Sequence, residues 1–567
     1  MKKAAKILLW ILIPLILLFG VLYFISQPLI KGILDERLED TRIGGLYQVQ
    51  VKTAYFDLFN LGISLKNVQL IPDSTIELFN RSPQIAYLNV KRVSLAYINP
   101  WKLFDNSELE IGKIKIIEPE LDLYFFDRKS IPNDDTNNDI DEFTALNIVG
   151  LELKKMRVQL HLKNKSKISI DRLDFEIAKP VIHPDLFPDI SKAIDYKKIN
   201  LEIKTLVLDN PKAFYTISLD DVEVDNHLSN IKLNGFKMIP KYDKNTFAKK
   251  HPYQTDRFVV ELEEIGISNL NFERFVNDKI LSIEHIDISG LQMEVYRDKN
   301  RPFNFNHFPK LPQQQIRSIK QLLEIEKIKI DNSNIVYLEK VQNGTTAGRV
   351  DFEDLKAQII NFGNTEQWQM EREFKINAQV NIYGKTPLFV QLNFPLGSNT
   401  FYASGQLKKS PMYVFNEIVT PGADIHIENG SIKKLDFNFT ANHQESSGEM
   451  VFLYNDLEVE LLKEKESGEV TERKFLNFLV NRFLLPKENP NRKGEEYHGI
   501  IAFDRDKNKS IFNYLWKSVF TGIKDTFLKE NKDIQDYTIA KEKAKQTRRE
   551  LRKQRREERR KERNKNK

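Results

Sequence analysis

One eight-residue pattern decides the fold, and it is clearest in three places. Residues 109–116 read LEIGKIKI, residues 281–288 read LSIEHIDI and residues 323–330 read LEIEKIKI. In each copy apolar residues alternate with other residues, two non-apolar residues intervene, and the alternation then resumes. Alternation of this kind is typical of a β-strand with one apolar and one polar face. The pattern therefore predicts strands that each have a single apolar side.

The pattern recurs along most of the chain. Further copies begin at residues 63, 88, 146, 168, 201, 217, 231 and 260, and a weaker copy begins at residue 350. The two-residue interruption would turn a strand over unless a bulge or a tight turn absorbs it. We therefore interpret each copy as a bent strand or as two short strands. Short polar turns favour antiparallel pairing, and repetition on this scale indicates a stacked, elongated architecture.

Polar residues fill the positions opposite the apolar ones, as at Lys113 and Lys115 or at Glu324 and Glu326. They predict a solvent-facing side for each strand. Tandem β-sandwiches are the alternative arrangement, because apolar alternation also builds sandwich cores. No linker separates the copies, however, which favours one long curved sheet.

The composition restricts the class of protein. The chain has 567 residues, with 86 Lys and Arg, 80 Asp and Glu, and no cysteine. Disulfides, thiolate metal sites and cysteine nucleophiles are therefore excluded. Positive charge is concentrated in residues 541–567, which hold 15 Lys and Arg against 5 Asp and Glu. The body of the chain is not basic, so we expect no nucleic-acid partner.

Residues 7–30 contain no charged side chain, and a segment of about 20 apolar residues is long enough to cross a bilayer. Three lysines precede this segment and acidic residues follow it, which predicts a cytoplasmic N-terminus. A cleaved signal peptide is the alternative, but its apolar region is usually shorter. The residues expected to anchor the chain are Ile7, Leu8, Leu9, Trp10, Leu15, Ile16, Leu17, Leu18 and Phe19.

These features together resemble the AsmA-like family, which belongs to the repeating β-groove, bridge-like lipid-transfer proteins. The resemblance includes the anchor, a short amphipathic helix expected at residues 29–38, and the repetition itself. It also includes the run LEIGKIKIIEPEL at residues 109–121, which is similar to the family's strand signature, and late strands at residues 425–437 and 448–462. The resemblance covers about residues 7–505, and the basic tail departs from it.

The resemblance implies a long antiparallel β-groove with an apolar lining. It implies attachment to the inner membrane of a two-membrane bacterium, with the main domain in the periplasm. The implied function is transfer or guiding of phospholipid in outer-membrane biogenesis. The alternative is a periplasmic scaffold that supports outer-membrane protein assembly without carrying lipid. The candidate lining residues are Ile111, Ile114, Ile116, Leu121, Leu123, Ile283, Ile286, Ile288, Ile325, Ile328 and Ile330.

The sequence contains no recognisable catalytic motif. Its nine histidines are scattered, and no nucleophile elbow or phosphate-binding glycine loop is present. The best metal candidate is the acidic stretch NDDTNNDIDE at residues 133–142, which lacks the central glycine of a calcium loop. We interpret it as a solvated insertion, and we expect no enzymatic activity, no cofactor and no metal.

The C-terminal part has helical spacing at residues 475–484 and 511–523. The second helix either caps the open end of the sheet or lies on a membrane or a partner protein, with Trp516 at headgroup depth. The tail is helical or disordered, and it either is solvated without a partner or binds an anionic surface such as lipid headgroups. The candidate residues for that binding are Arg548, Arg549, Arg552, Arg555, Arg556, Arg559 and Arg560.

The predicted fold class is mainly β. A cytoplasmic stub and a transmembrane anchor at residues 1–30 precede a repeating β-groove at residues 31–465. Late strands and amphipathic helices follow at residues 466–530, and the basic tail occupies residues 531–567. Envelope proteins are possible partners at the C-terminal end.

Overall fold

The computed structural model describes eleven longer stretches of the chain and three short ones. The described residues are 20–36 without 22, 38, 42–43, 47–57, 60–72, 84–98, 110–125, 146–182, 194–195, 198–225, 229–344, 346–423, 425–462 and 485–529. They divide into two units, which are described separately. Unit 1 is Met1–Asp243 with Val259–Gly290, and unit 2 is Lys244–Phe258 with Leu291–Lys567.

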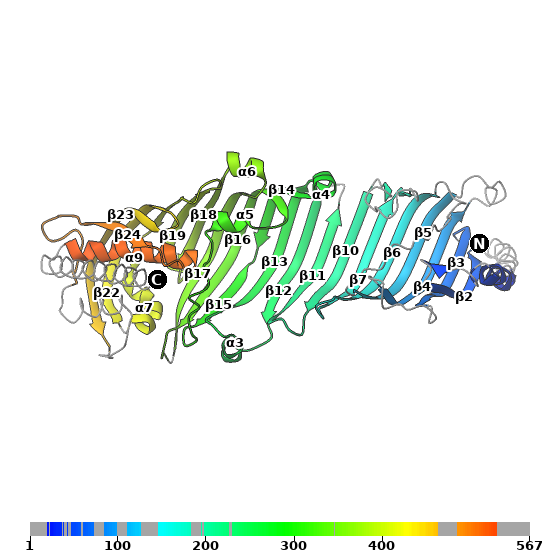
Figure 1. The fold of residues 1–567 in the computed structure, drawn as a ribbon, viewed down its shortest axis with the longest axis horizontal. Coiled ribbons are helices and arrows are strands. Elements are labelled where there is room, and N and C mark those ends of the chain that lie inside the picture. The colour runs from blue at the N-terminus through cyan, green and yellow to red at the C-terminus, as the bar shows by residue number, and fades with distance from the viewer. Residues whose placement is uncertain are drawn as a thin grey trace, which may run out of the picture. The chain divides into compact units, whose positions relative to one another are not determined.

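Unit 1 is built from long strands that lie side by side (Figure 1). The strands pair in the order β1 to β7 and then β10 to β14, and the short β8 pairs with the start of β6 and with β9. The bounds are β1 Arg42–Ile43, β2 Tyr47–Asp57, β3 Gly62–Pro72, β4 Gln84–Ile98, β5 Glu110–Tyr124, β6 Leu146–His161, β7 Lys167–Ala178, β8 Val181–Ile182, β9 Ile194–Asp195, β10 Lys198–Asp209, β11 Tyr215–Asp225, β12 Asn230–Pro240, β13 Asp256–Leu270, α4 Phe272–Asp278 and β14 Ile280–Ser289.

The two-residue interruption of the repeat forms a bend that neighbouring strands share. Its second residue has left-handed backbone geometry at Asn67 in β3, Thr205 in β10 and Gly235 in β12, with φ values of 49°, 53° and 65°. The strand opposite skips one residue at the same place. In β10 and β11, for example, the pair Lys204 and Asp221 is followed directly by Leu206 and Leu219. Each strand therefore bends without losing register, and the apolar residues on both sides of the bend stay on one face.

Unit 2 contains the remaining strands and most of the helices. Its strands pair in the order β15 to β20, then β22 to β24, and the short β21 pairs with β22. The strands are β15 Gln292–Asp298, β16 Leu322–Lys340, β17 Ala347–Gly363, β18 Glu373–Ile382, β19 Thr386–Pro395, β20 Phe401–Leu407, β21 Ser410–Pro411, β22 Ile425–Ala441, β23 Glu445–Leu461 and β24 His498–Asp504. The helices are α3 Lys244–Lys250, α5 Pro312–Arg317, α6 Glu366–Glu371, the 3₁₀ helix η4 Met412–Phe415, α7 Asn416–Ala423 and α9 Ile511–Lys529.

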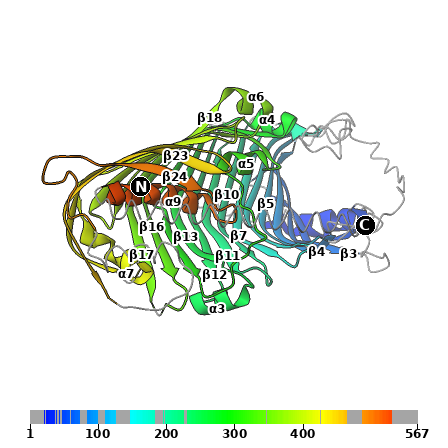
Figure 2. The same ribbon diagram turned by 60° about the vertical axis from the view of Figure 1, so that its left-hand side comes forward.

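One face of the unit 2 sheet is closed by its own helices. Rings from β18, β19, β20 and α9 pack in succession, with centroid separations of 5.4 Å for Phe374 and Phe394, 5.1 Å for Phe394 and Phe401, and 5.9 Å for Phe401 and Tyr514. Leu311, just before α5, is fully buried in the same core. Figure 2 shows α9 running alongside β23 and β24, which it contacts. Unit 2 therefore has a filled hydrophobic core.

Two neighbouring strand pairs are parallel, although short turns favour antiparallel pairing. β5 is parallel to β6, and β15 is parallel to β16. Each pair is joined by a long connection, residues 125–145 in the first case and residues 299–321, with α5, in the second. A parallel pair needs such a connection because the chain must return to the same end of the sheet. Antiparallel pairing is confirmed for the other neighbouring strands given above.

A helix precedes the first strands. Residues 23–36 are helical, the Tyr23 and Tyr55 rings lie 4.9 Å apart, and the backbone NH of Phe56 donates to Ser26 Oγ at 3.1 Å. No described helix has both the length and the apolar composition needed to cross a bilayer. Most of the expected anchor, with Ile7, Leu8, Leu9, Trp10, Leu15, Ile16, Leu17, Leu18 and Phe19, lies outside the described residues, as do residues 133–142, 475–484 and the basic tail.

The bend in β12 gives a first testable prediction. A Cβ atom on Gly235 would lie 2.1 Å from Asp220 Oδ2 and 2.7 Å from Asp220 Cβ, at a φ of +65°. We therefore expect Gly235→Ala to lower the free energy of unfolding by about 1–3 kcal/mol. Gly266→Ala on β13 is the matched control, because open space surrounds its Cβ position. Urea unfolding of both variants measures the difference in the free energy of unfolding. Equal effects of the two substitutions would contradict a left-handed bend at Gly235.

Candidate functional site

A single row of apolar side chains crosses unit 1 from β3 to β14. Its members face one another in register from each strand to the next, so they share one face of the sheet. The row consists of Leu65, Val93, Ile116, Leu153, Phe175, Leu201, Val224, Ile231, Ile267 and Ile286. Every member is half-buried, since each packs against its neighbours in the sheet but keeps part of its surface exposed. With strands about 4.8 Å apart, the row is roughly 40 Å long.

The predicted lining residues occupy this face in unit 1. Ile114, Ile116, Leu121 and Leu123 on β5 and Ile286 and Ile288 on β14 are half-buried, whereas Ile283 is buried with 4% of its surface exposed. Ile111 belongs to β5, and its side chain lies outside the described residues. Ile116 and Ile286 are members of one row, although 170 positions separate them in the chain. The residues between them, such as Leu201, carry the same repeat pattern, but the list of candidates omitted them.

The third predicted group lies on β16 of unit 2. Ile325 is buried with 7% exposed, and Ile328 and Ile330 are half-buried. Their partners on β17 are Phe362, Ile359 and Ala357. These residues border the filled core of unit 2, so their surroundings differ from those of the unit 1 row.

The opposite face of unit 1 carries ion pairs between neighbouring strands. Lys115 Nζ lies 3.5 Å from Glu152 Oε2, Lys204 Nζ 2.8 Å from Asp221 Oδ1, and Lys232 Nζ 2.7 Å from Glu264 Oε2. These pairs span β5 to β6, β10 to β11 and β12 to β13. The polar face predicted from Lys113 and Lys115 is therefore confirmed.

Glu324 departs from that prediction. It lies on β16 with only 7% of its surface exposed, and it accepts a hydrogen bond of 2.7 Å from Thr365 Oγ1. Its neighbour Glu326 is exposed, as predicted. The connection after β17 covers the first residues of β16, which explains why a polar position there is buried.

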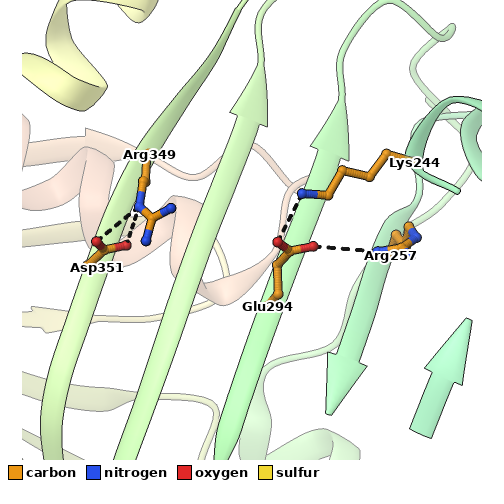
Figure 3. A network of polar contacts seen from close by, with 5 residues as sticks. All are labelled: Lys244, Arg257, Glu294, Arg349 and Asp351. Carbon is orange, nitrogen blue, oxygen red and sulfur yellow. Dashed lines mark hydrogen bonds and ion pairs between the residues drawn. The ribbon is translucent and has the colours of Figure 1, made fainter.

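A network of charged side chains joins α3 to the strands of unit 2 (Figure 3). Glu294 on β15 accepts from Lys244 Nζ at 2.9 Å and from Arg257 Nη1 at 3.5 Å. Arg349 Nε donates to both carboxylate oxygens of Asp351, at 2.8 and 3.0 Å. This hydrogen bond raises the pKa of Arg349 above its usual range. Each cation in Figure 3 is paired with a carboxylate. The contact between Lys244 and Glu294 links α3 to β15. We therefore interpret the network as structural.

Helix α9 packs on β23 and β24 through one side and exposes aromatic rings on another. Tyr514 is buried, with a pKa raised to about 12 mainly by its burial, and Ser518 Oγ lies 2.7 Å from Ser446 Oγ. Phe512 and Trp516 are 78% and 56% exposed. Helix α9 thus packs against the last two strands of the sheet, whereas capping of the open end of the sheet stays a prediction.

Two comparisons with known proteins gave no match. No protein-family model matches the chain, and no curated protein matches it significantly. Among the residues that the structure describes, no group of His, Asp and Glu side chains is arranged to hold a metal ion. The apolar row is therefore the feature from which a function can be argued.

The ion pairs of the polar face predict that the protein becomes less stable at low pH. Burial alone would raise the pKa of Glu152 and Asp221, but hydrogen bonds from Lys113 and Lys204 outweigh it and lower both values. A carboxylate with a lowered folded-state pKa stabilises the fold above its unfolded value near 4, and that contribution disappears as the pH falls. We expect each pair to contribute a few tenths to about 1 kcal/mol.

The measurement is urea unfolding of the full chain between pH 7 and pH 3. The Glu152→Gln variant is the control, and its stability should fall less with acidification than that of the unaltered chain. An identical pH dependence for the two proteins would contradict the role given to Glu152.

Because the side chains of the apolar row are partly exposed, we predict that a charged substitution in the row lowers the free energy of unfolding only moderately. In Ile286→Asp the new carboxylate can reach water, so we expect a loss of about 1–2 kcal/mol in the free energy of unfolding. Ile501→Asp places the same group at a fully buried position of unit 2, where an unpaired charge costs several kcal/mol. Thermal unfolding of both variants compares the sites, and an equal loss at the two positions would show that the row is packed like a core.

Proposed function

We propose that this chain carries or guides lipid by holding acyl chains against the apolar face of its sheet. The observation that carries the proposal is the row from Leu65 to Ile286, in which every side chain is apolar and half-buried. Burial of each CH₂ group is worth about 0.8 kcal/mol, so a chain of ~16 carbons resting on such a face recovers much of roughly 12 kcal/mol. The charged opposite face keeps the protein soluble on its other side.

In this proposal the apolar face of unit 1 lines a trough, as the resemblance to AsmA-like proteins implies. Phospholipid is the ligand, and its headgroup stays in water at the open side. The protein takes part in no chemical conversion, because movement of a lipid along a trough requires no bond to break.

The proposal places the chain on the inner membrane, with residues 7–30 as its single anchor and its body in the periplasm. The helix at residues 23–36 supports this placement, because it presents apolar side chains to solvent one turn apart. Ile25, Leu29 and Ile33 are 60%, 63% and 56% exposed. An exposed apolar stripe next to an uncharged segment is suited to contact with lipid.

A scaffold role in the periplasm is the second candidate. The filled core of unit 2 favours it, since rings such as Phe394 and Phe401 occupy the space that an acyl chain would need. In that role the exposed rings of α9 would bind another envelope protein.

Lipid content distinguishes the two functions. The full-length chain is purified in a mild detergent, and mass spectrometry counts the phospholipid that remains bound. We expect retained lipid with the unaltered chain and a loss of at least about fivefold with Leu201→Asp, because a charge in the row opposes acyl contact. Asn200→Asp, on the opposite face of the same strand, is the control and should retain lipid. Absence of lipid from all three proteins would favour the scaffold.

A further inference from the structure

One face of the unit 2 sheet packs on the filled core, and the other carries a row of uncharged polar side chains. The members of this row face one another in register on β17, β18, β19, β20 and β22, so they lie side by side. With strands about 4.8 Å apart, the row is roughly 19 Å long. We call it the amide row, and it consists of Gln358, Asn377, Gln391, Ser404 and Asn438.

Most side chains of the amide row have no partner within the part of the chain that the structure describes. Asn438 donates from Nδ2 to Glu449 Oε1 at 3.3 Å, which leaves its carbonyl oxygen as an acceptor. An amide group offers two N–H donors and one oxygen acceptor, so the row presents unused donors and acceptors to solvent. The members whose side chains make no hydrogen bond to a described residue are Gln358, Asn377, Gln391 and Ser404.

The polar face of unit 1 is built differently. There ion pairs join neighbouring strands, as between Lys204 and Asp221 at 2.8 Å and between Lys232 and Glu264 at 2.7 Å. Such pairs keep a strand face in contact with water. In unit 2 five strands carry amide or hydroxyl groups at one register position instead. Solubility alone therefore does not account for the amide row.

Two open hollows follow the two sides of the amide row. The first has a volume of about 360 Å³ and lies between the row and a second line of side chains that includes Gln379 and Phe389. The second has a volume of about 320 Å³ and is bordered on its far side by Asn393 and Tyr402. Asn377 lines both hollows, as does Gln391, so the two hollows adjoin. Each is large enough for part of a small organic ligand.

An aromatic ring borders each hollow. Tyr402 precedes Ser404 by two residues on β20 and is 50% exposed, and Phe389 precedes Gln391 by two residues on β19 and is half-buried. Alternate residues of a strand share a face, so both rings lie beside the amide row. The face of an aromatic ring is electronegative and attracts weakly positive C–H groups. Each hollow therefore offers hydrogen-bonding groups on one side and a ring on the other.

The charged side chains that line the hollows are mostly paired. Lys375 Nζ lies 3.0 Å from Glu373 Oε2, and Lys329 forms an ion pair with Asp331. Lys356 is a further exposed cation at the border of the first hollow. An apolar ligand would leave the amides without partners, and an acidic polymer would meet little excess positive charge. The lining therefore complements a ligand that is uncharged and rich in hydroxyl groups.

We propose that the amide row and its two hollows bind an uncharged oligosaccharide. Sugar hydroxyls both donate and accept hydrogen bonds, as the amide side chains do, and the C–H faces of sugar rings pack against Tyr402 and Phe389. A sugar chain laid across the strands meets a member of the row about every 4.8 Å. This inference goes beyond the proposed function and does not depend on it, since it uses neither lipid nor the apolar row of unit 1.

The test titrates three uncharged hexasaccharides, chitohexaose, maltohexaose and cellohexaose, separately into the full-length chain. The protein is kept in a detergent without a sugar headgroup, and saturation-transfer NMR of the sugar protons measures binding. We expect at least one hexasaccharide to bind, and we expect Asn377→Ala and Gln391→Ala each to weaken it about fivefold, as the loss of about one hydrogen bond corresponds to. Tyr402→Ala should also weaken binding, whereas Tyr402→Phe keeps the ring and should not.

Asn381→Ala is the matched control. Asn381 lies on β18 on the same face as Asn377, but it lines neither hollow, and its Nδ2 donates to Asp354 Oδ2 at 3.2 Å. This variant should bind as the unaltered chain does, and unfolding temperatures of all variants verify that each is folded. An equal loss of binding in Asn381→Ala would assign the effect to the face as a whole and overturn the site.

Other ligands give outcomes that are distinct from the expected one. The acidic hexagalacturonate should bind more weakly than the uncharged sugars, and Lys356→Gln should leave their binding unchanged. Tighter binding of hexagalacturonate that is lost in Lys356→Gln would overturn the uncharged ligand. Binding of a peptide rich in Gln and Ser, with none of the three hexasaccharides bound, would assign the row to a protein partner.

Absence of binding by all three hexasaccharides would overturn the inference. That result would leave the proposed function in place, because lipid transfer is tested by the phospholipid that the chain retains.

Discussion

The register between neighbouring strands is the constraint on which the rest of unit 1 depends. A slip of one residue would move every apolar side chain of a strand to the charged face. The repeat contains an interruption that would produce this change, yet Leu65, Val93 and Ile116 remain in one row. They do so because facing strands bend at the same place, with left-handed residues such as Asn67 and Thr205 in alternate strands. The bend is therefore what makes a continuous apolar row compatible with long strands.

The two units are built from the same kind of strand, but their apolar faces differ in how far they are buried. In unit 2 the apolar face is covered by α9 and by the segment around Leu311, and rings such as Phe394 are fully buried. In unit 1 the corresponding side chains are half-buried, so the surface that folding leaves uncovered is available for a ligand. In the proposed function acyl chains cover this face, and their contact removes from water the apolar surface that the fold leaves exposed.

The strands and their two faces could be predicted from the sequence because both follow from a period of two. The alternation around Ile116 and Ile286 was sufficient for that. The parallel pairing of β5 with β6 was not predictable, since it depends on the path of a long connection that has no periodic signal. The burial of Glu324 depends on residues that follow β17, and the hydrogen bond from Asn508 Nδ2 to the backbone oxygen of Phe305 joins segments about 200 positions apart. Tertiary packing determines contacts of this kind, and a local sequence pattern contains no information about them.

The central claim is that one face of unit 1 holds acyl chains and the other does not. The chain has no cysteine, so single cysteines introduced at Ile116 and at the adjacent Lys115 can each be labelled with an environment-sensitive fluorophore. The two positions share a strand and differ only in the face from which they project. On addition of phospholipid vesicles to the full-length chain, the account predicts a blue shift and an intensity increase for the label at position 116 and little change at position 115. An equal response at the two positions, or none at position 116, would contradict it.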